Sequence, residues 1–365
     1  MPQSAIHDSD ILSRLRFPLA VVVVFIHSYG PAISKAALAQ PFTSQWGYEV
    51  LRVAFSHSLG DFAVPMFFLI AGFFFFLSMQ RWNWRLYGQK MRRRVSTLLI
   101  PYLVWNILYV LHTTWPTLAP ALIQGDWSGW LARLNRMGGW HMLWDSRTMP
   151  NGVTTPVLVP TWFLRDLIVL DIMAPLLYCL IRRMRWVLVA VVSVLAICQW
   201  WIPLHGFSSW STLWFALGAT FSIEGLSIKR TLRPWALPSA MAAVAMGVVV
   251  VWLEMHGGRP QWIRVLYIVP AMATMFNLCG WLMRKGCLQE HTWAARSTMF
   301  VYLSHVFFLT YVMRQVKALF PPSSAILASI DYLLTPLLTV AICCAIYNLY
   351  FFISKGFLRH NQSND

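Results

Sequence analysis

The stretch VPMFFLIAGFFFF occupies residues 64–76 and contains no charged side chain. It lies in an apolar segment that we predict to run from 57 to 79, which is long enough to cross a membrane as one helix. Hydrophobic residues make up 58% of the 365 residues and charged residues only 12%, whereas a water-soluble protein carries roughly a quarter charged residues. The composition therefore predicts that most of the chain lies in a lipid membrane.

Segments of this kind recur along almost the whole chain and leave little room for a water-soluble domain. We predict an all-α, polytopic bundle of about ten transmembrane helices. Residues 1–365 then form one integral membrane domain with both termini in the cytoplasm. The predicted spans are 15–34, 57–79, 95–112, 161–181, 186–202, 209–226, 235–254, 264–283, 298–316 and 329–353.

Positive charge gives the orientation of these spans. The formal net charge is +16, and most of the 29 Lys and Arg residues lie in short clusters between apolar segments. Basic residues accumulate in cytoplasmic loops, where they also attract anionic membrane lipid, so we expect no nucleic-acid partner. With the N-terminus inside, the inside clusters are Arg14 and Arg16; Arg81, Arg85, Lys90, Arg92, Arg93 and Arg94; Arg182, Arg183 and Arg185; Lys229, Arg230 and Arg233; Arg284, Lys285 and Arg296; and Lys355 and Arg359.

One longer polar segment, at about 113–160, is predicted to be an extracytoplasmic loop. It is rich in tryptophan. Aromatic rings next to polar groups suit stacking on sugar faces, and they equally suit a belt at the membrane interface or packing within the loop. The tryptophans are Trp115, Trp127, Trp130, Trp140 and Trp144.

The cysteines and histidines do not predict a metal site. The six cysteines show neither metal-ligand spacing nor a disulfide pattern, and no spacing of His, Cys and carboxylates matches a closed or open metal site. We therefore expect no bound metal.

The first span carries an arginine and a histidine on one helix face. In RFPLAVVVVFIH, Arg16 and His27 are eleven residues apart, which is about 16 Å along a helix axis and nearly a whole number of turns. An ionisable side chain inside a membrane is costly unless it faces a polar cavity, and neutral imidazole is well suited to accept a proton from a hydroxyl. The alternative is a histidine that only hydrogen-bonds a neighbouring helix.

These motifs resemble the membrane acyltransferase family 3. The family's mark is an Arg, ten residues and a His in the first span, matched here by Arg16 and His27. The run at 64–76 is similar to the family's proline followed by paired Phe and a small-residue pair. Further similar segments are QKMRRRVSTLLIPYLVW at 89–105, PTWFLRDLIVL at 160–170 and VYLSH at 301–305.

Two positions depart from the family's pattern. Pro18 stands where a small residue such as Gly is commoner, which is tolerable near a helix start. Ala71 replaces the usual Ser before Gly72, so no serine chemistry is assigned there.

The resemblance implies a membrane O-acyltransferase of the bacterial cytoplasmic (inner) membrane. Its donor, usually acetyl-CoA, enters from the cytosol as a substrate and not as a tightly bound cofactor. Its acceptor, an envelope glycan or a lipid-linked sugar, waits at the outer face. The candidates for binding the donor's phosphates through forked hydrogen bonds are Arg16, Arg92, Arg93 and Arg94, and topological anchoring is the alternative for each.

Within this interpretation the catalytic candidates are His27 as general base, Arg16 and Asp61. Asp61 opens the second span on the outer side, where a carboxylate can orient the imidazole and stabilise its charged form, or simply cap a helix. Trp162, Arg165 and Asp166 are candidates for binding the acceptor. Structural pairing of Arg165 with Asp166 is the favoured alternative. His305, in the ninth span, is expected to make a helix-packing hydrogen bond.

A secondary transporter or flippase is the main alternative function, because buried Arg, His and Asp can also form a proton or substrate pathway. Transporters typically contain interrupted helices in paired halves, and the sequence shows no such symmetry. A non-catalytic envelope scaffold is a third possibility. The motifs favour acyl transfer.

Overall fold

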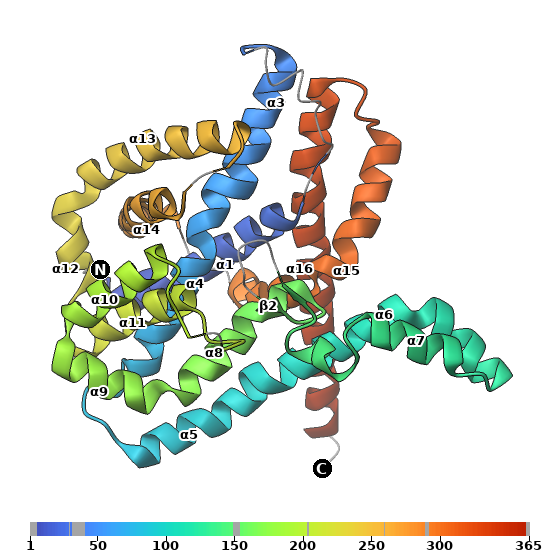
Figure 1. Cartoon of the computed structure of the whole chain (residues 1–365), viewed down its shortest axis with the longest axis horizontal. Helices are drawn as coiled ribbons and strands as arrows, with labels where there is room; N and C mark the ends of the chain where they lie inside the picture. Colours follow the sequence, from blue (N-terminus) through green and yellow to red (C-terminus); the bar gives the residue numbers. More distant parts are fainter. Residues whose placement is uncertain are drawn as a thin grey trace. The chain divides into compact units, whose positions relative to one another are not determined.

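The structure is a computed structural model that describes residues 6–28, 30, 41–148, 154–202, 204–258, 260–288 and 292–362. Helices dominate the described part of the chain (Figure 1). Its only strands, β1 (Arg147–Thr148) and β2 (Thr154–Thr155), form one short antiparallel ribbon. The prediction of an all-α membrane protein is confirmed.

The chain divides into two compact units. Unit 1 comprises Met1–Phe67 and Ser227–Asp365, and unit 2 comprises Phe68–Leu226. The elements of unit 1 are α1 (Asp8–His27), α3 (Ser44–Val53), the π-helix η1 (Ala54–Leu59), the start of α4 (Gly60–Phe76), α12 (Ile228–Leu232), η5 (Arg233–Trp235), α13 (Ala236–Met255), α14 (Gln261–Arg284), α15 (Thr292–Leu319) and α16 (Ala325–Gln362).

Unit 2 contains the rest of α4 and the middle of the chain. Its further elements are α5 (Trp84–Arg94), the π-helix η2 (Val95–Leu99), α6 (Ile100–Gln124), α7 (Ser128–Arg136), η3 (Gly139–Leu143), the β-ribbon, η4 (Val159–Thr161), α8 (Trp162–Ile172), α9 (Ala174–Met184), α10 (Trp186–Ile197) and α11 (Ser209–Ile223).

Five helical segments among the described residues are long and apolar enough to cross a membrane. Helices also lie at the other predicted spans, but they are shorter or more polar. The five are Ser44–Phe76, Trp84–Gln124, Ile228–Met255, Gln261–Arg284 and Ala325–Ser354.

The boundaries of the first helix differ from the prediction. Helix α1 begins at Asp8 and ends at His27. The start was predicted too late because the first turn of the helix is polar. Ser28 is extended, which ends the helix, and the predicted end at 34 lies outside the described residues. His27 is therefore the last residue of α1. The twenty residues of α1 still measure about 30 Å, the thickness of a membrane core.

The predicted spans at 161–181 and 186–202 correspond to three short helices, α8, α9 and α10. Helices α8 and α9 separate at Met173, and Pro175 lies in the first turn of α9. Arg185 has a positive φ of 51°, which separates α9 from α10. In contrast, α6 continues past the predicted end at 112 to Gln124, where Gly125 ends it in the left-handed conformation.

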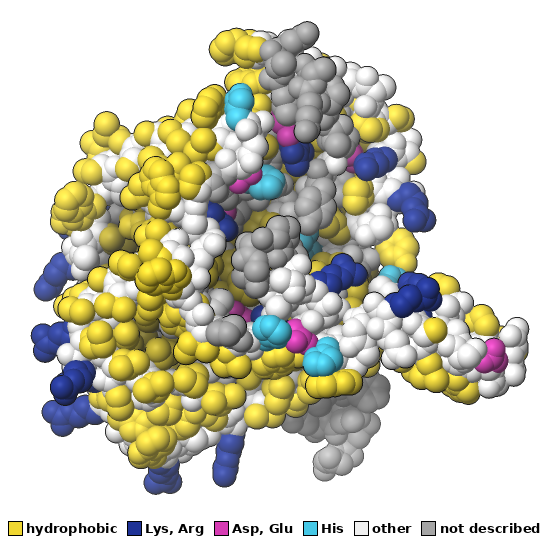
Figure 2. Space-filling model, viewed as in Figure 1, with side chains coloured by type: hydrophobic (Ala, Val, Ile, Leu, Met, Phe, Trp, Pro, Cys, Tyr) yellow, Lys and Arg dark blue, Asp and Glu magenta, His cyan; other side chains and the backbone are white. Residues whose placement is uncertain are grey.

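The outer surfaces of the helices are apolar. On α13, Leu237, Met241, Val244 and Val248 recur at helical spacing, and each is at least 65% exposed. Figure 2 shows broad areas of hydrophobic side chains on the visible face, interrupted by few charged ones. Such a surface suits lipid and would be an aggregation hazard in water.

Helix α1 lies at the centre of unit 1. Val24 packs in one buried cluster with Val301 and Leu309 of α15 and Val340 of α16. The next residue, Phe25, belongs to a second cluster with Tyr48 of α3 and Ala328 and Tyr332 of α16. Helices α15 and α16 run antiparallel beside each other (Figure 1), and α1 packs against both of them and against α3.

In unit 2, α4 and α11 cross at two glycines. A Cβ atom on Gly72 would lie 2.1 Å from the carbonyl oxygen of Phe215, and one on Gly218 would lie 2.0 Å from that of Leu69. Small residues allow helix backbones in membranes to approach this closely. The small-residue pair of the 64–76 run therefore serves packing.

Replacing Gly218 with Val should prevent this crossing. The added side chain meets backbone atoms that cannot move independently, so we expect a destabilisation of about 3 kcal/mol or more and a marked fall in Tm of the detergent-solubilised protein. The control is Gly88→Ala, because a Cβ at Gly88 meets nothing within 4 Å. An unchanged Tm for Gly218→Val would contradict the close crossing.

Candidate active site

The C-terminal end of α1 is fixed by hydrogen bonds and by a close helix contact. The carbonyl oxygen of Phe25 accepts from the Ser28 backbone N–H at 3.1 Å and from Ser56 Oγ at 2.9 Å. A Cβ on Gly60 would lie 2.7 Å from Ile26 Cγ1, so the start of α4 lies directly against the residue before His27. The position of His27 is thus determined by η1 and α4.

The imidazole of His27 faces α15. Its ring centre lies 5.2 Å from that of His305, with 38° between the ring planes. His27 is half-buried, and His305 is fully buried. Tyr302 and Phe67 pack edge to face beside this pair, with ring centres 6.0 Å apart. The first predicted catalytic residue therefore points toward another histidine inside unit 1.

The hydrogen bonds of His305 define its protonation pattern. Its Nδ1 lies 2.8 Å from the carbonyl oxygen of Tyr302 and 3.1 Å from that of Val301. Because carbonyl oxygens only accept, Nδ1 carries the proton. The expected helix-packing hydrogen bond exists, but it is made to the backbone of α15 itself. Nε2 is then an acceptor, and no hydrogen-bond partner for it is found among the described residues.

Arg16 lies near the middle of α1, because the helix begins at Asp8, and it is about 16 Å from His27 along the axis. Its side chain is exposed. The beginning of this helix is held by polar contacts. Asp8 accepts hydrogen bonds from the backbone N–H groups of Ile228 at 2.7 Å and Lys229 at 2.9 Å. Arg14 donates to the carbonyl oxygen of Leu288 at 2.9 Å. One helix thus connects an exposed guanidinium with the histidine pair.

Asp61 lies near the C-terminal end of α1 but forms an ion pair with another residue. It is buried, and its Oδ1 lies 3.1 Å from Nη2 of Arg264 in α14. Gly60, the preceding residue, contacts Ile26 of α1. The structure therefore brings Asp61 to the level of His27. Sequence analysis did not single out Arg264, although it begins a predicted apolar span on the same side as Asp61.

A second polar group lies beside the same end of α1. Tyr332 Oη is 2.7 Å from Ser56 Oγ and donates to the carbonyl oxygen of Arg52 at 3.3 Å. Gly30 has a φ of +56°, and a Cβ there would lie 2.6 Å from Tyr48 Oη. These contacts explain why the chain can turn immediately after α1.

Three of the four predicted donor-binding arginines, Arg92, Arg93 and Arg94, lie in unit 2 at the end of α5, whereas Arg16 lies in unit 1. Arg92 and Arg93 are exposed, whereas Nε of Arg94 lies 2.9 Å from Oδ2 of the buried Asp171. The π-helix η2 follows them, and its wider turn accommodates Pro101, which has no N–H for a regular helical bond. The ion pair therefore fixes Arg94 but involves neither Arg92 nor Arg93.

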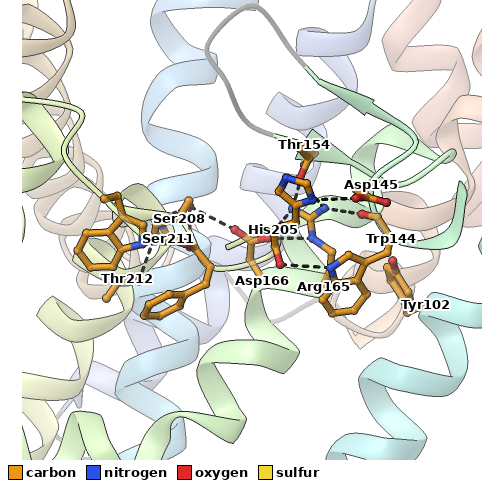
Figure 3. A network of polar contacts seen from close by, with 12 residues as sticks. Tyr102, Trp144, Asp145, Thr154, Arg165, Asp166, His205, Ser208, Ser211 and Thr212 are labelled. Atoms are coloured by element: carbon orange, nitrogen blue, oxygen red, sulfur yellow. Dashed lines mark hydrogen bonds and ion pairs between the residues drawn. The ribbon is translucent and has the colours of Figure 1, made fainter. Parts of the chain in front are cut away.

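Arg165 and Asp166 form the centre of a buried network in unit 2 (Figure 3). Nη2 of Arg165 lies 2.9 Å from Oδ1 of Asp166, and both side chains are at most 1% exposed. Arg165 also donates to the carbonyl oxygens of Trp144 at 2.6 Å and Thr154 at 2.8 Å. Ser208 Oγ donates to Asp166 Oδ2 at 3.2 Å. The pair therefore fixes the 113–160 segment to α8, while Trp162 beside it is half-buried.

The same network reaches the surface through Asp145. His205 Nδ1 lies 2.7 Å from one of its oxygens and His141 Nδ1 lies 3.0 Å from the other. Burial raises the pKa of Asp145, but the hydrogen bonds with His205 and His141 outweigh this and leave the pKa below its ordinary value. Asp145 is therefore an anion at neutral pH. Trp144 donates through Nε1 to the carbonyl oxygen of His205 at 3.2 Å, so this tryptophan packs against the connection between α10 and α11.

In the part of the chain that the structure describes, no group of three or more His, Cys, Asp or Glu side chains is placed to hold a metal ion.

The fold and this site define a helical membrane protein with an imidazole pair inside one of its units. The model of an acyltransferase domain family, acyltransferase 3, matches residues 11–348. The chain therefore belongs to this family, which confirms the resemblance seen in its motifs.

The chain is similar to the succinoglycan biosynthesis protein ExoH of Rhizobium meliloti (strain 1021). The two are 28% identical over 255 residues, which cover 67% of this chain and 62% of that protein. The chain thus matches about three fifths of the length of this relative. No solved structure matches the chain.

Removing Arg165 should destabilise unit 2. In Arg165→Ala, Asp166 stays buried without its cation, and loss of one partner of a buried pair costs about 3–5 kcal/mol. We expect a large fall in Tm, and Arg165→Lys should not restore it because an ammonium cannot reproduce the forked hydrogen bonds. Arg147→Ala, at an exposed position of the same segment, is the control. Equal Tm values for Arg165→Ala and the control would show that the network contributes little.

Proposed function

We propose that the protein transfers an acyl group, in the first instance acetyl, from a cytosolic acyl-CoA to a hydroxyl of a cell-envelope polysaccharide. The observation that carries the proposal is the inward-facing His27 on a helix that also bears Arg16, in a member of an acyltransferase family. The relative named for succinoglycan biosynthesis supports a polysaccharide acceptor or its lipid-linked precursor.

We place the chain in the bacterial inner membrane as one domain with ten spans and both termini in the cytoplasm. Contacts within unit 1 support alternating directions. The start of α1 lies against Ile228 and Cys279. Its end lies against Gly60 and Tyr332. Asp61, the residue after Gly60, pairs with Arg264 of α14. The start of α14 therefore lies by the end of α1 and its later part by the start of α1, so α14 runs in the opposite direction to α1. The 113–160 segment then lies outside.

In the proposed reaction, His27 accepts the proton of the acceptor hydroxyl while that oxygen attacks the thioester carbonyl. The C–O bond forms, the C–S bond breaks, and the proton on His27 passes to the departing CoA thiolate. Base catalysis supplies about 10²- to 10⁴-fold. Holding both substrates in line in a site that excludes water supplies the larger share. No bound cofactor or metal takes part in these steps.

The donor's phosphates are assigned to Arg16, Arg92, Arg93 and Arg94. The exposure of Arg16, Arg92 and Arg93 supports direct contact with a phosphate. Arg94 forms an ion pair with Asp171, so we assign it the role of orienting the cluster. Guanidinium groups bind phosphate through two parallel hydrogen bonds, which a lysine cannot match.

On the acceptor side we assign positioning roles. Asp61, held by Arg264, places negative charge at the level of His27 and stabilises its protonated form. Trp162, which is half-buried, offers an aromatic face to the acceptor. Arg165 and Asp166 contribute to acceptor binding indirectly, because they fix the segment that carries Trp144.

Replacing His27 with Ala should remove acyl transfer. The variant keeps the helix but loses the base, so we expect the ester content of surface glycans to fall to background, as measured by mass spectrometry of glycans from cells that produce the variant. The control is His112→Ala, at an exposed position of α6. Normal acylation by a folded His27→Ala protein would remove His27 from the mechanism.

Replacing Arg92 and Arg93 together with Gln should weaken donor binding. A loss of about 1.4 kcal/mol in binding free energy lowers affinity about tenfold. We expect the two substitutions together to lose at least that much, so KM for acetyl-CoA should rise at least about tenfold while kcat changes little. Arg183→Gln, also exposed and in a basic cluster, controls for net charge. An unchanged KM would assign the two arginines to membrane anchoring alone.

A further inference from the structure

The Nε2 atom of His305 is a buried acceptor that the proposed reaction does not yet use. His305 is fully buried, its Nδ1–H is bound to backbone carbonyl oxygens, and no hydrogen-bond partner of Nε2 is found among the described residues. Polar atoms in protein interiors are normally hydrogen-bonded, so an unpartnered buried acceptor beside the proposed base calls for an explanation.

The nearest ring whose position is described is that of His27. A hydrogen bond of about 3 Å between two imidazoles in line puts their centres about 5 Å apart, and the two centres are 5.2 Å apart here. The separation of the two rings therefore matches that of a hydrogen-bonded pair in which a His27 N–H is directed at Nε2 of His305. The backbone hydrogen bonds hold the His305 ring, so its lone pair has a fixed direction.

We infer that His305 is a positioning residue that accepts a hydrogen bond from His27 through Nε2. This inference rests on the proposed function. One ring nitrogen of His27 donates to His305, and the other keeps its lone pair for the acceptor hydroxyl. The contact selects one tautomer and one orientation of the base, as a buried carboxylate does for the histidine of hydrolytic triads.

The contact also fits the proton balance of the reaction. When His27 takes the hydroxyl proton it becomes an imidazolium, and its second N–H is then a charge-assisted donor to Nε2. His305 stays neutral throughout, because its own proton remains on Nδ1. The proton leaves His27 for the CoA thiolate, so His305 neither gains nor loses one in a turnover.

A purely structural role for His305 predicts a different outcome. If only the shape of the ring and its backbone hydrogen bonds mattered, any side chain that fills the space would serve, and an acceptor atom would be irrelevant. Comparing an apolar substitute with one that carries an acceptor therefore separates the two roles.

The experiment compares His305→Leu and His305→Gln in purified protein reconstituted into liposomes with acetyl-CoA and a soluble glycan acceptor. We expect kcat to fall on the order of 10²-fold or more in the Leu variant, with KM for acetyl-CoA unchanged. The amide oxygen of Gln can accept a hydrogen bond, so the Gln variant should recover at least about a tenth of the parental kcat. Ser304→Ala, a neighbouring buried position bonded to Phe300, is the control and should stay near the parental kcat.

Each result decides between the roles. Parental kcat in His305→Leu, or equal losses in folded Leu and Gln variants, overturns the positioning role. His27→Ala is measured in the same liposomes: full activity there contradicts the proposed base, whereas an inactive His27→Ala beside an active His305→Leu contradicts only the inference about His305. Absence of transfer by the parent protein would overturn both.

Discussion

The packing of α1 against α3, α15 and α16 is the constraint on which the site in unit 1 depends. Val24 and Phe25 each enter a different buried cluster, which fixes the rotation of the helix about its axis. With that rotation set, the side chain two residues later, His27, turns toward His305 and not toward lipid. The contact between Gly60 and Ile26 fixes the position of the C-terminal end of α1 along its axis. Apolar packing thus places an ionisable group where its chemistry is useful.

The polar groups of both units follow the rule that a membrane protein must satisfy its polar atoms internally. In unit 2, Arg165 and Asp166 neutralise one another and bind backbone carbonyls of the 113–160 segment. In unit 1, Asp61 pairs with Arg264 and Asp8 caps the start of α12. Several buried side-chain atoms in the described part of the chain have no hydrogen-bond partner, and Nε2 of His305 is the one whose ring lies 5.2 Å, centre to centre, from that of His27.

The sequence predicted the helical membrane class, the family and the separation of Arg16 and His27, because these depend on composition and on spacing within one helix. It did not predict that α1 ends at His27, since the end depends on Ser28 leaving the helix and on Ser56 and Gly60, which are remote in sequence. The His27–His305 and Asp61–Arg264 pairs join helices far apart in the chain, and spacing within a segment carries no information on them. The breaks at Met173 and Arg185 depend on local backbone geometry that apolar composition conceals.

An acyltransferase and a transporter with the same buried groups differ in one respect: only the enzyme cleaves a thioester. The most direct measurement is therefore the release of free CoA thiol by the purified protein in liposomes that hold no ion gradient, with acetyl-CoA and a glycan acceptor present. The account predicts thiol release that requires the acceptor and equals the ester formed on it. Movement of substrate across the bilayer without any loss of thioester would contradict it.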